Sequence, residues 1–223
     1  MEVTWTPRRF RLIVFDWDGT LADSTALIAD CIQRACHDIA EPVPDEATAR
    51  YVIGLGLADM LRHIAPGLPA ERHGELTARY RHHFLTRDAE IPLFEGVRDL
   101  LADLDEAGFL LGVATGKSRA GLNRAMAQQG IGRRFVATRC ADEGFPKPHP
   151  DMLLNLMTRT GFDPGETLMI GDTTHDLELA RNAGTAAIAV SYGAHPPAGL
   201  AEFEPLATVD SVAELHRWLR ANA

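Results

Sequence analysis

Two carboxylates spaced one residue apart are the first residues of this chain that could do chemistry. Asp16 and Asp18 follow the apolar residues 12–15 and precede Gly19. Such an apolar run, ending at a glycine, predicts a buried strand followed by a tight turn. Because side chains two residues apart in an extended chain share a side, both carboxylates would lie together at the carboxyl end of this strand. Asp-x-Asp-Gly is also ordinary turn chemistry, so this stretch alone leaves a functional and a local interpretation open.

Three later stretches also place polar side chains after apolar runs or in stiff loops. Thr115 and Lys117 follow residues 109–114, Asp172 follows residues 167–170, and Lys147 is followed by Pro148 and, two residues later, a second proline. Parallel strands end at one common edge, so residues far apart in the sequence can converge there. The sequence therefore predicts one composite site.

These residue types suit phosphoryl transfer. The Asp16 carboxylate could attack phosphorus and form an aspartyl-phosphate that water then cleaves. Asp18 could protonate the leaving oxygen and later accept a proton from the attacking water, and the like charges around it would favour its protonated form. The Thr115 hydroxyl and the Gly116 backbone N–H, predicted at a helix start, could bind the phosphoryl group, with Lys147 as a fixed positive charge. Asp16, Asp18, Thr115 and Lys147 are thus the predicted catalytic residues.

The same carboxylates predict a cation site. Asp16, Asp18, Asp172 and Asp176 carry four negative charges, which Lys147 and one Mg²⁺ would reduce to a single negative charge, or to none when Asp18 holds its proton. All of these donors are oxygens, and no His or Cys shows ligand spacing nearby, so the pattern favours Mg²⁺ over zinc. The expected metal ligands are Asp16, Asp18 and Asp172.

Taken together, the motifs resemble those of the haloacid dehalogenase-like superfamily of hydrolases. The matching stretches cover about residues 12–190 in the family's order: Asp16-Trp17-Asp18-Gly19-Thr20, Thr115-Gly116, Lys147-Pro148-His149-Pro150 and Gly171-Asp172-Thr173-Thr174-His175-Asp176. The resemblance implies a Rossmann-like core, a helical cap inserted after the first motif, an aspartyl-phosphate intermediate and Mg²⁺. It also implies that Asp18 binds the metal through its backbone carbonyl and that Asp176 is a supporting carboxylate.

The second acidic residue of the first motif separates two activities within that family. Its dehalogenases lack a residue equivalent to Asp18, because no leaving group needs a proton, so the resemblance implies a phosphatase. The chain is most similar to members of the phosphoglycolate phosphatase type, whose substrate is a small phosphate monoester. A sugar phosphomutase and a catalytically silent binding protein stay open as alternatives, and the reaction product would distinguish them.

The order of predicted elements indicates an α/β fold. Strands at 12–16, 109–114, 135–137, 167–170 and 186–190 alternate with helices from residue 91 onward, which predicts a doubly wound, Rossmann-like parallel sheet. Residues 22–90 show helical spacing and no convincing strand. We therefore expect a core of residues 1–21 and 91–223 and an α-helical cap of residues 22–90.

Composition narrows the class of partner. The 223 residues are 46% hydrophobic and 24% charged, which is typical of a globular protein, and the net charge of −9 argues against nucleic acid. Cys31, Cys36 and Cys140 have no metal-like spacing and suit free, buried thiols in a reducing compartment. No apolar run is long enough for a signal peptide or a membrane span. These features predict a cytoplasmic protein that acts on a small phosphorylated metabolite, with no membrane partner and with its state as monomer or dimer undetermined.

Within the predicted cap, the sequence leaves the substrate-selecting residues open. Gly54-Leu55-Gly56-Leu57 is either a substrate-selecting loop or a turn between helices. Arg50, Arg62 and His63 either contact a substrate anion or lie on solvated helix faces. Ser24 is expected to cap the first cap helix.

Overall fold

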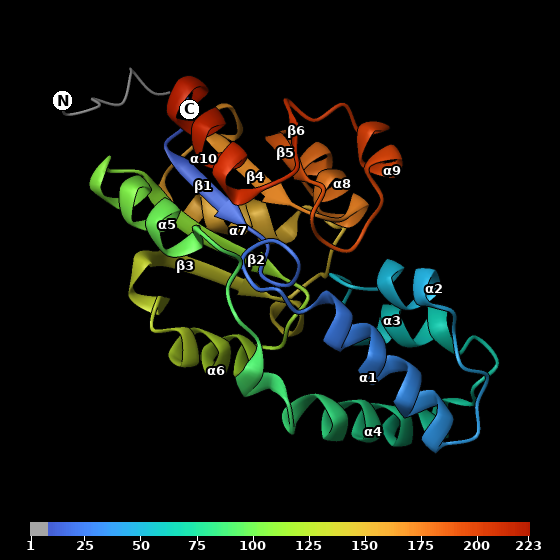
Figure 1. The fold of residues 1–223 in the computed structure, drawn as a ribbon. Helices are drawn as coiled ribbons and strands as arrows, with labels where there is room; N and C mark the ends of the chain where they lie inside the picture. Colours follow the sequence, from blue (N-terminus) through green and yellow to red (C-terminus); the bar gives the residue numbers. More distant parts are fainter. Residues whose placement is uncertain (1–8) are drawn as a thin grey trace.

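The computed structural model describes residues 9–223, so Arg8 and the rest of residues 1–8 of the predicted core lie outside the described residues. Within the described part, the centre is a sheet of six parallel strands in the order β3-β2-β1-β4-β5-β6 (Figure 1). The strands are β1 (Leu12–Phe15), β2 (Leu110–Thr115), β3 (Phe135–Cys140), β4 (Thr167–Gly171), β5 (Ala186–Val190) and β6 (Thr208–Val209). From β1 the chain adds β2 and β3 on one side and then β4, β5 and β6 on the other, so β1 lies between β2 and β4. This is the topology of a doubly wound sheet, as predicted.

Helices cover both faces of this sheet. The α-helices of the described part are α1 (Thr25–Asp38), α2 (Glu46–Tyr51), α3 (Leu57–Ile64), α4 (His73–Leu85), α5 (Val97–Glu106), α6 (Arg119–Gln129), α7 (Asp151–Thr160), α8 (Thr174–Ala183), α9 (Pro197–Ala201) and α10 (Val212–Asn222). Ile13 and Phe15 of β1 pack in one hydrophobic cluster with α5, α6 and α10, whereas Leu12 and Val14 pack in another with α7 and α8. The alternation of β1 side chains thus fills both layers of the core.

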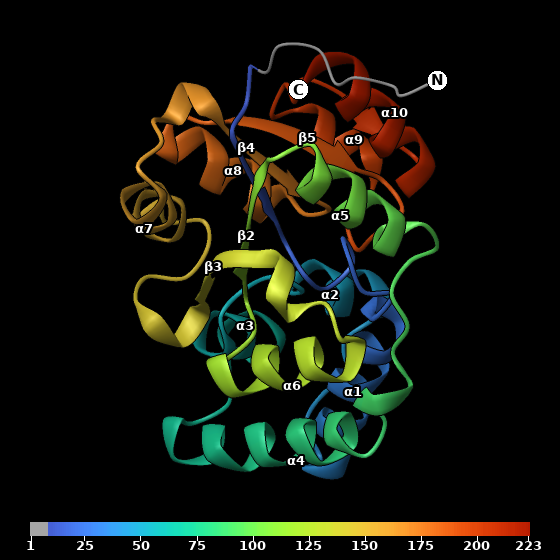
Figure 2. The ribbon, with the colours of Figure 1, turned by 90° about the vertical axis from the view of Figure 1, so that its left-hand side faces the viewer.

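The helical insertion lies between β1 and β2 and gathers at one end of the sheet (Figure 2). Its helices α1–α4 form a separate hydrophobic cluster, which runs from Ile28 to Phe84 and takes in Ala194 from the core. The last helix of the insertion, α5, instead packs on the sheet through Val97 and Leu101. The boundaries of the cap at residues 22 and 90 stay a prediction.

Two expected helix caps differ in detail from the prediction. Ser24 stands at the N-cap of α1 but makes no side-chain capping bond, because its hydroxyl donates to Asp18 Oδ1 at 2.7 Å. At α10, the spacing of Ser211 and Glu214 predicts a capping box. Ser211 accepts from the backbone N–H of Glu214, but the Glu214 carboxylate accepts from the backbone N–H of Asp210 and so does not close the box. At α1, the Ser24 hydroxyl therefore binds the site residue Asp18 instead of a backbone N–H of the helix.

The three cysteines are buried and free, as predicted. Among the helices of residues 9–223, none has the length and apolar composition to cross a membrane.

Candidate active site

The register of β1 with its neighbours sets the predicted residues side by side. Phe15 lies opposite Val113 of β2 and Ile170 of β4, and the backbone N–H of Asp16 donates to the Ile170 carbonyl at 2.9 Å. Asp16 and Asp172 therefore emerge at the same edge of the sheet, one and two residues beyond these pairs. The convergence predicted from the strand ends is observed.

Three buried carboxylates form an acidic cluster at this edge. Asp16, Asp172 and Asp176 each place a carboxylate oxygen within 4.8 Å of the others, and none is more than 1% exposed. Lys147 reaches the cluster from the loop after β3, with its Nζ 2.7 Å from Asp16 Oδ1 and 2.6 Å from Asp176 Oδ1. When all three carboxylates are ionised, their charges and that of Lys147 leave the cluster with two negative charges in a buried environment.

One carboxylate oxygen in this cluster has no partner. Asp16 Oδ2 is buried and accepts no hydrogen bond from any described residue. By contrast, Asp176 Oδ2 accepts from both the backbone N–H and the hydroxyl of Thr173, at 3.0 and 2.7 Å. A buried, unpaired carboxylate oxygen is costly, so this atom marks the place for a ligand or a cation.

Asp172 is held in a fixed orientation from both sides. Its Oδ1 accepts from the hydroxyl of Thr20, and its Oδ2 from the backbone N–H of Ala194, both at 2.7 Å. Gly19 lies against the Asp172 carboxylate and has a φ of +83°. A Cβ at this position would lie 2.2 Å from Asp172 Oδ2. Only a glycine meets both conditions, which gives a physical reason for the glycine in the first motif.

Burial dominates the electrostatics of the cluster. It raises the pKa of Asp16 to about 7, an effect that Lys147 opposes and the neighbouring carboxylates reinforce. Burial and the charges of Asp16 and Asp176 raise the pKa of Asp172 well above its usual value. Burial lowers the pKa of Lys147, but its two carboxylate partners outweigh that effect and raise the pKa above the usual value. Oxygen donors alone, an excess of negative charge and one unpaired oxygen fit a divalent cation site.

Asp18 lies outside this cluster and forms an ion pair with a different lysine, Lys117. Its Oδ1 is 3.0 Å from Lys117 Nζ and accepts from the Ser24 hydroxyl. The like charges that the sequence places around Asp18 are thus joined by a cation, Lys117, which the spacing of the first two motifs did not reveal as a partner. Lys117 Nζ also stands 4.8 Å from the centre of the Phe84 ring of α4, so this cation bridges core and cap.

The second motif lies where the cap meets the core. Thr115 is fully buried, and its hydroxyl accepts from the backbone N–H of Lys117 at 3.2 Å. A Cβ on Gly116 would lie 2.5 Å from the carbonyl oxygen of Gly54 and 2.7 Å from that of Leu55, so glycine is required for the cap loop to approach this closely. Helix α6 begins only at Arg119, and Gly116 therefore lies in the turn before the helix rather than at its start.

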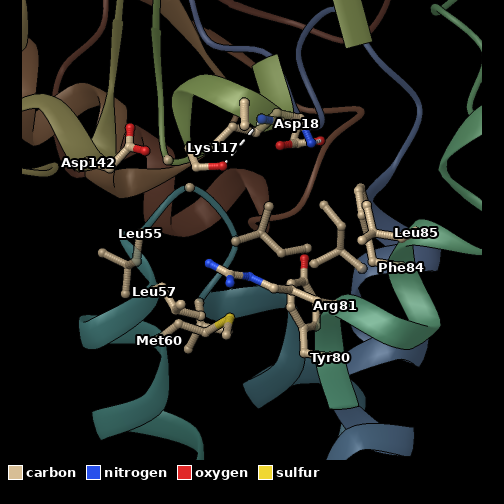
Figure 3. Close-up of a pocket in the computed structure, with 18 of the residues that line it drawn as sticks. Asp18, Leu55, Leu57, Met60, Tyr80, Arg81, Phe84, Leu85, Lys117 and Asp142 are labelled. Carbon is tan, nitrogen blue, oxygen red and sulfur yellow. Dashed lines mark hydrogen bonds and ion pairs between the residues drawn. The ribbon is translucent and has the colours of Figure 1, made fainter. Parts of the chain in front are cut away.

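A pocket of about 420 Å³ opens between cap and core (Figure 3). Its core side includes Asp18, Gly116 and Lys117, and its cap side includes Gly54 and Leu55. The loop at 54–57 therefore borders the pocket, as its functional interpretation requires. Arg50 and Arg62 do not line the pocket but pair with acidic residues of their own helices, Glu46 and Asp59, as solvated helix faces do.

Three rings connect the cap to the core: Tyr51, which is partly exposed, and the buried His175 and His195. The Nε2 atoms of His175 and His195 lie 2.8 and 3.0 Å from the carbonyl oxygen of Tyr51, at the end of α2, and the Tyr51 ring stacks on His195. The backbone N–H of Thr174 donates to His195 Nδ1 at 3.1 Å, which fixes His195 as the neutral tautomer with its proton on Nε2. Burial, together with His175, lowers the pKa of His195 to about 4.

Sequence reasoning missed several of these supporting residues. Thr20 and Ser24 stand in or just after the first motif, and their hydroxyl groups were a signal that could have been used. Ala194 acts through its backbone N–H and His195 comes from a distant loop, so neither carried a signal in the sequence.

Comparison with known proteins identifies the family. The model of the haloacid dehalogenase-like hydrolase family matches residues 13–190. The "Probable phosphatase IndB" of Dickeya dadantii is 37% identical over 92% of this chain and 91% of its own length. A phosphoglycolate phosphatase of Vibrio vulnificus is 34% identical over 94% of this chain and 96% of its own.

Solved structures show the same fold. The crystal structure of a predicted phosphoglycolate phosphatase from Haemophilus somnus superposes with a TM-score of 0.84 at 24% identity, over 94% of this chain and 98% of that one. The helical insertion between β1 and β2 is the kind of cap found in this fold. The chain belongs to the haloacid dehalogenase-like hydrolase family and is one of its phosphatases.

Proposed function

We propose that the protein is a Mg²⁺-dependent phosphatase that hydrolyses a small phosphate monoester, of the phosphoglycolate or sugar phosphate kind, through an aspartyl-phosphate on Asp16. The observation that carries this proposal is the buried and unpaired Oδ2 of Asp16, in a cluster with an excess of negative charge. Lys147 holds the other oxygen of the same carboxylate at 2.7 Å and so fixes the direction in which Oδ2 points. A nucleophile needs this combination of a fixed orientation and a free lone pair.

In the first half of the reaction, Asp16 Oδ2 forms a bond to phosphorus, and the bond from phosphorus to the alcohol oxygen breaks. Asp18 donates a proton to the departing oxygen. In the second half, the Asp18 carboxylate accepts a proton from a water molecule that attacks phosphorus, and the bond from phosphorus to Asp16 breaks. Inorganic phosphate is released, and both aspartates return to their starting states.

The ion pair between Asp18 and Lys117 must open for this sequence to start. A phosphate monoester brings its own negative charges, which offer Lys117 an alternative partner to the Asp18 carboxylate at 3.0 Å. Transfer of Lys117 to the substrate would leave Asp18 beside an anion, where its protonated form is favoured. Substrate binding and protonation of the acid would in this way be coupled.

The remaining predicted residues fit supporting roles. Thr115 and Gly116 would donate hydrogen bonds to the transferring phosphoryl group, and Lys147 would add a positive charge. Asp16, Asp172 and the backbone carbonyl of Asp18 would hold Mg²⁺, which would supply positive charge to the phosphoryl oxygens. Asp176 suits a supporting role, because its oxygens are already engaged by Lys147 and Thr173.

Phosphate release from p-nitrophenyl phosphate tests this function. We expect release that requires Mg²⁺, is abolished by excess EDTA and is lost in Asp16→Asn, while circular dichroism shows an intact fold. Asp210→Asn is the matched control, because that aspartate is exposed and outside the site, and it should retain parental activity. Release that survives in Asp16→Asn would contradict the nucleophile assignment. In a parallel incubation with a sugar phosphate as substrate, an isomerised sugar phosphate in place of free phosphate would favour a mutase.

A further inference from the structure

The pocket lies where the alcohol part of a bound ester would be. Asp18, the predicted proton donor to the leaving oxygen, lines it, whereas Asp16 and Lys147 do not. A phosphoryl group bound at Asp16 would therefore direct the rest of the ester past Asp18 and into this space. The pocket would therefore contact the leaving alcohol and govern which alcohol the enzyme accepts.

The size and the walls of the pocket favour a bulky apolar alcohol. Its volume of about 420 Å³ falls within the range of ~300–1,000 Å³ typical of pockets for drug-sized ligands and is far larger than a two-carbon acid requires. The cap side is built mainly from apolar side chains: Ile28, Val52, Ile53, Leu55, Leu57, Met60, Phe84 and Leu85. A small hydrophilic alcohol would leave most of this apolar surface in contact with trapped water, which is unfavourable.

One cation in the pocket lacks an acidic partner. Lys117 pairs with Asp18 at 3.0 Å, and Arg124 pairs with Asp88 at 2.5 Å. Arg81, which extends from α4 into the pocket (Figure 3), has no carboxylate within 4.0 Å in the part of the chain that the structure describes. The remaining acid of the lining, Asp142, accepts from the backbone N–H of Arg119.

Tyr80 adds a hydroxyl donor beside Arg81. Its side chain rises from α4 toward the side of the pocket where Asp18 and Lys117 lie (Figure 3). Burial and the nearby Asp18 charge raise its pKa above the usual value, so the hydroxyl keeps its proton. Tyr80 and Arg81 together offer hydrogen-bond donors on an otherwise apolar cap wall.

We infer that the physiological ester carries a bulky, largely apolar or aromatic alcohol with an anionic group at its far end, which Arg81 binds. This inference rests on the proposed function and narrows its substrate class, away from the smallest esters such as phosphoglycolate. The apolar wall selects for the body of the alcohol, and Arg81 selects for its distal charge.

Four esters of primary alcohols separate the two parts of this inference. Ethyl phosphate is small and neutral beyond the phosphate, 2-phosphoglycolate is small and carboxylated, benzyl phosphate is bulky and neutral, and 4-carboxybenzyl phosphate is bulky and carboxylated. We expect kcat/KM to rise from ethyl to benzyl phosphate and to rise again, by at least about tenfold, for 4-carboxybenzyl phosphate. Tenfold is the lower end of what one charge-assisted hydrogen bond contributes.

Two pocket variants, each with a matched control, assign the effects to residues. Arg81→Gln should remove the advantage of 4-carboxybenzyl over benzyl phosphate and leave benzyl phosphate unchanged, whereas Arg79→Gln, on the same helix but outside the pocket lining, should change neither. Ala120→Phe fills the pocket from the first turn of α6 and should reduce activity on both benzyl esters but not on ethyl phosphate. Ala127→Phe, exposed on the same helix and outside the lining, is its control.

The outcomes distinguish this inference from the proposed function. Equal kcat/KM for ethyl and 4-carboxybenzyl phosphate, or an equal loss on all four esters in Arg81→Gln, would overturn the substrate class while leaving an Asp16-dependent phosphatase intact. No phosphate release from any of the four esters would contradict the proposed function itself, and the inference with it.

Discussion

The acidic cluster and the pocket beside it are built in opposite ways. In the cluster, buried carboxylates lie at the ends of β1 and β4 and in the first turn of α8, and Asp172 and Asp176 are held by neighbours on both oxygens. On the cap side of the pocket, the side chains come from α1, α3, α4 and connecting loops, and the pocket cation Arg81 has no acidic partner among residues 9–223. The side chains of the cluster are fixed by their partners, whereas the cap side chains of the pocket can be substituted without disturbing the sheet.

This difference indicates which part of the fold carries out the reaction and which part selects the substrate. Strand ends in a parallel sheet are fixed by backbone hydrogen bonds, so they can hold charges that repel one another. Helix faces of a cap require only apolar packing inward, so the residues facing the pocket are free to suit a substrate. We expect substitutions in the cluster to cost stability and rate together, and substitutions in the pocket to change selectivity.

The largest effect is expected from Lys147→Met. This change removes the cation that lies between Asp16 and Asp176 and leaves uncompensated buried charge, which costs about 3–5 kcal/mol. Urea unfolding should show that loss of stability, and kcat should fall by at least about 10²-fold because transition-state charge loses a partner. Lys117→Met, whose partner Asp18 is not part of the cluster, should destabilise far less; equal destabilisation by both would contradict the contrast between the regions.

The joint between cap and core should show a pH dependence of stability. His195 has a pKa of about 4 in the folded protein and near 6.5 when unfolded. Between these values the unfolded chain binds a proton that the folded protein does not, so the free energy of unfolding falls as pH drops from about 6.5 to about 4. The loss from this residue would reach about 3 kcal/mol.

Urea titrations of the parent and His195→Gln across this pH range measure the effect of His195. The neighbouring His175 titrates in the same direction, since burial lowers its pKa too, so the difference between parent and variant is the quantity to compare. We expect a flatter pH dependence in His195→Gln. Parallel curves for the two proteins would show that His195 is not held neutral by its contacts with Tyr51 and Thr174.

A smaller effect is expected where the two regions touch. Gly116→Ala would place a Cβ within 2.5 Å of the Gly54 carbonyl oxygen and push the cap loop away from the second motif. We expect kcat/KM to fall by about tenfold or more, because misplacement of a binding group by a fraction of an ångström costs rate. Gly67→Ala, where a Cβ meets no atom within 4 Å, should leave kcat/KM unchanged; parental kinetics in Gly116→Ala would contradict a fixed cap loop.

The smallest effect concerns the orientation of Asp18. Ser24→Ala removes the hydroxyl that donates to Asp18 Oδ1, and one such hydrogen bond contributes about 0.5–1.5 kcal/mol. We expect kcat to fall between about twofold and tenfold. Ser211→Ala loses the serine that accepts at the start of α10, far from the site, and should lower stability without lowering kcat.

The sequence predicted the cluster better than the pocket, for a physical reason. Strand ends follow from apolar runs, and parallel strands share an edge, so the convergence of Asp16, Asp172 and Lys147 could be expected from the order of motifs. The doubly wound sheet followed from the same alternation of strands and helices. These are consequences of local pattern and of general topology.

The contacts that were not predicted depend on distant segments. The ion pair between Asp18 and Lys117 joins two motifs whose relative orientation is set only when β1 and β2 pair. The contact between His195 and Tyr51 brings together a loop after β5 and the end of α2, and no spacing in the chain encodes it. Which cap side chains face the pocket depends likewise on how α1–α4 pack, so the selecting residues could not be named from the sequence.

The most direct test of the central claim is to trap the intermediate on Asp16. Protein mixed with substrate and Mg²⁺ is quenched, treated with borohydride, which reduces an aspartyl-phosphate to homoserine, and analysed by peptide mass spectrometry. With p-nitrophenyl phosphate as the substrate, whose leaving group departs without a proton, we predict homoserine at position 16. We predict more of it in Asp18→Asn, because only the second step then lacks Asp18, and none when substrate is omitted. Homoserine at another aspartate, or substrate turnover with no reducible adduct at residue 16 in either protein, would contradict the account.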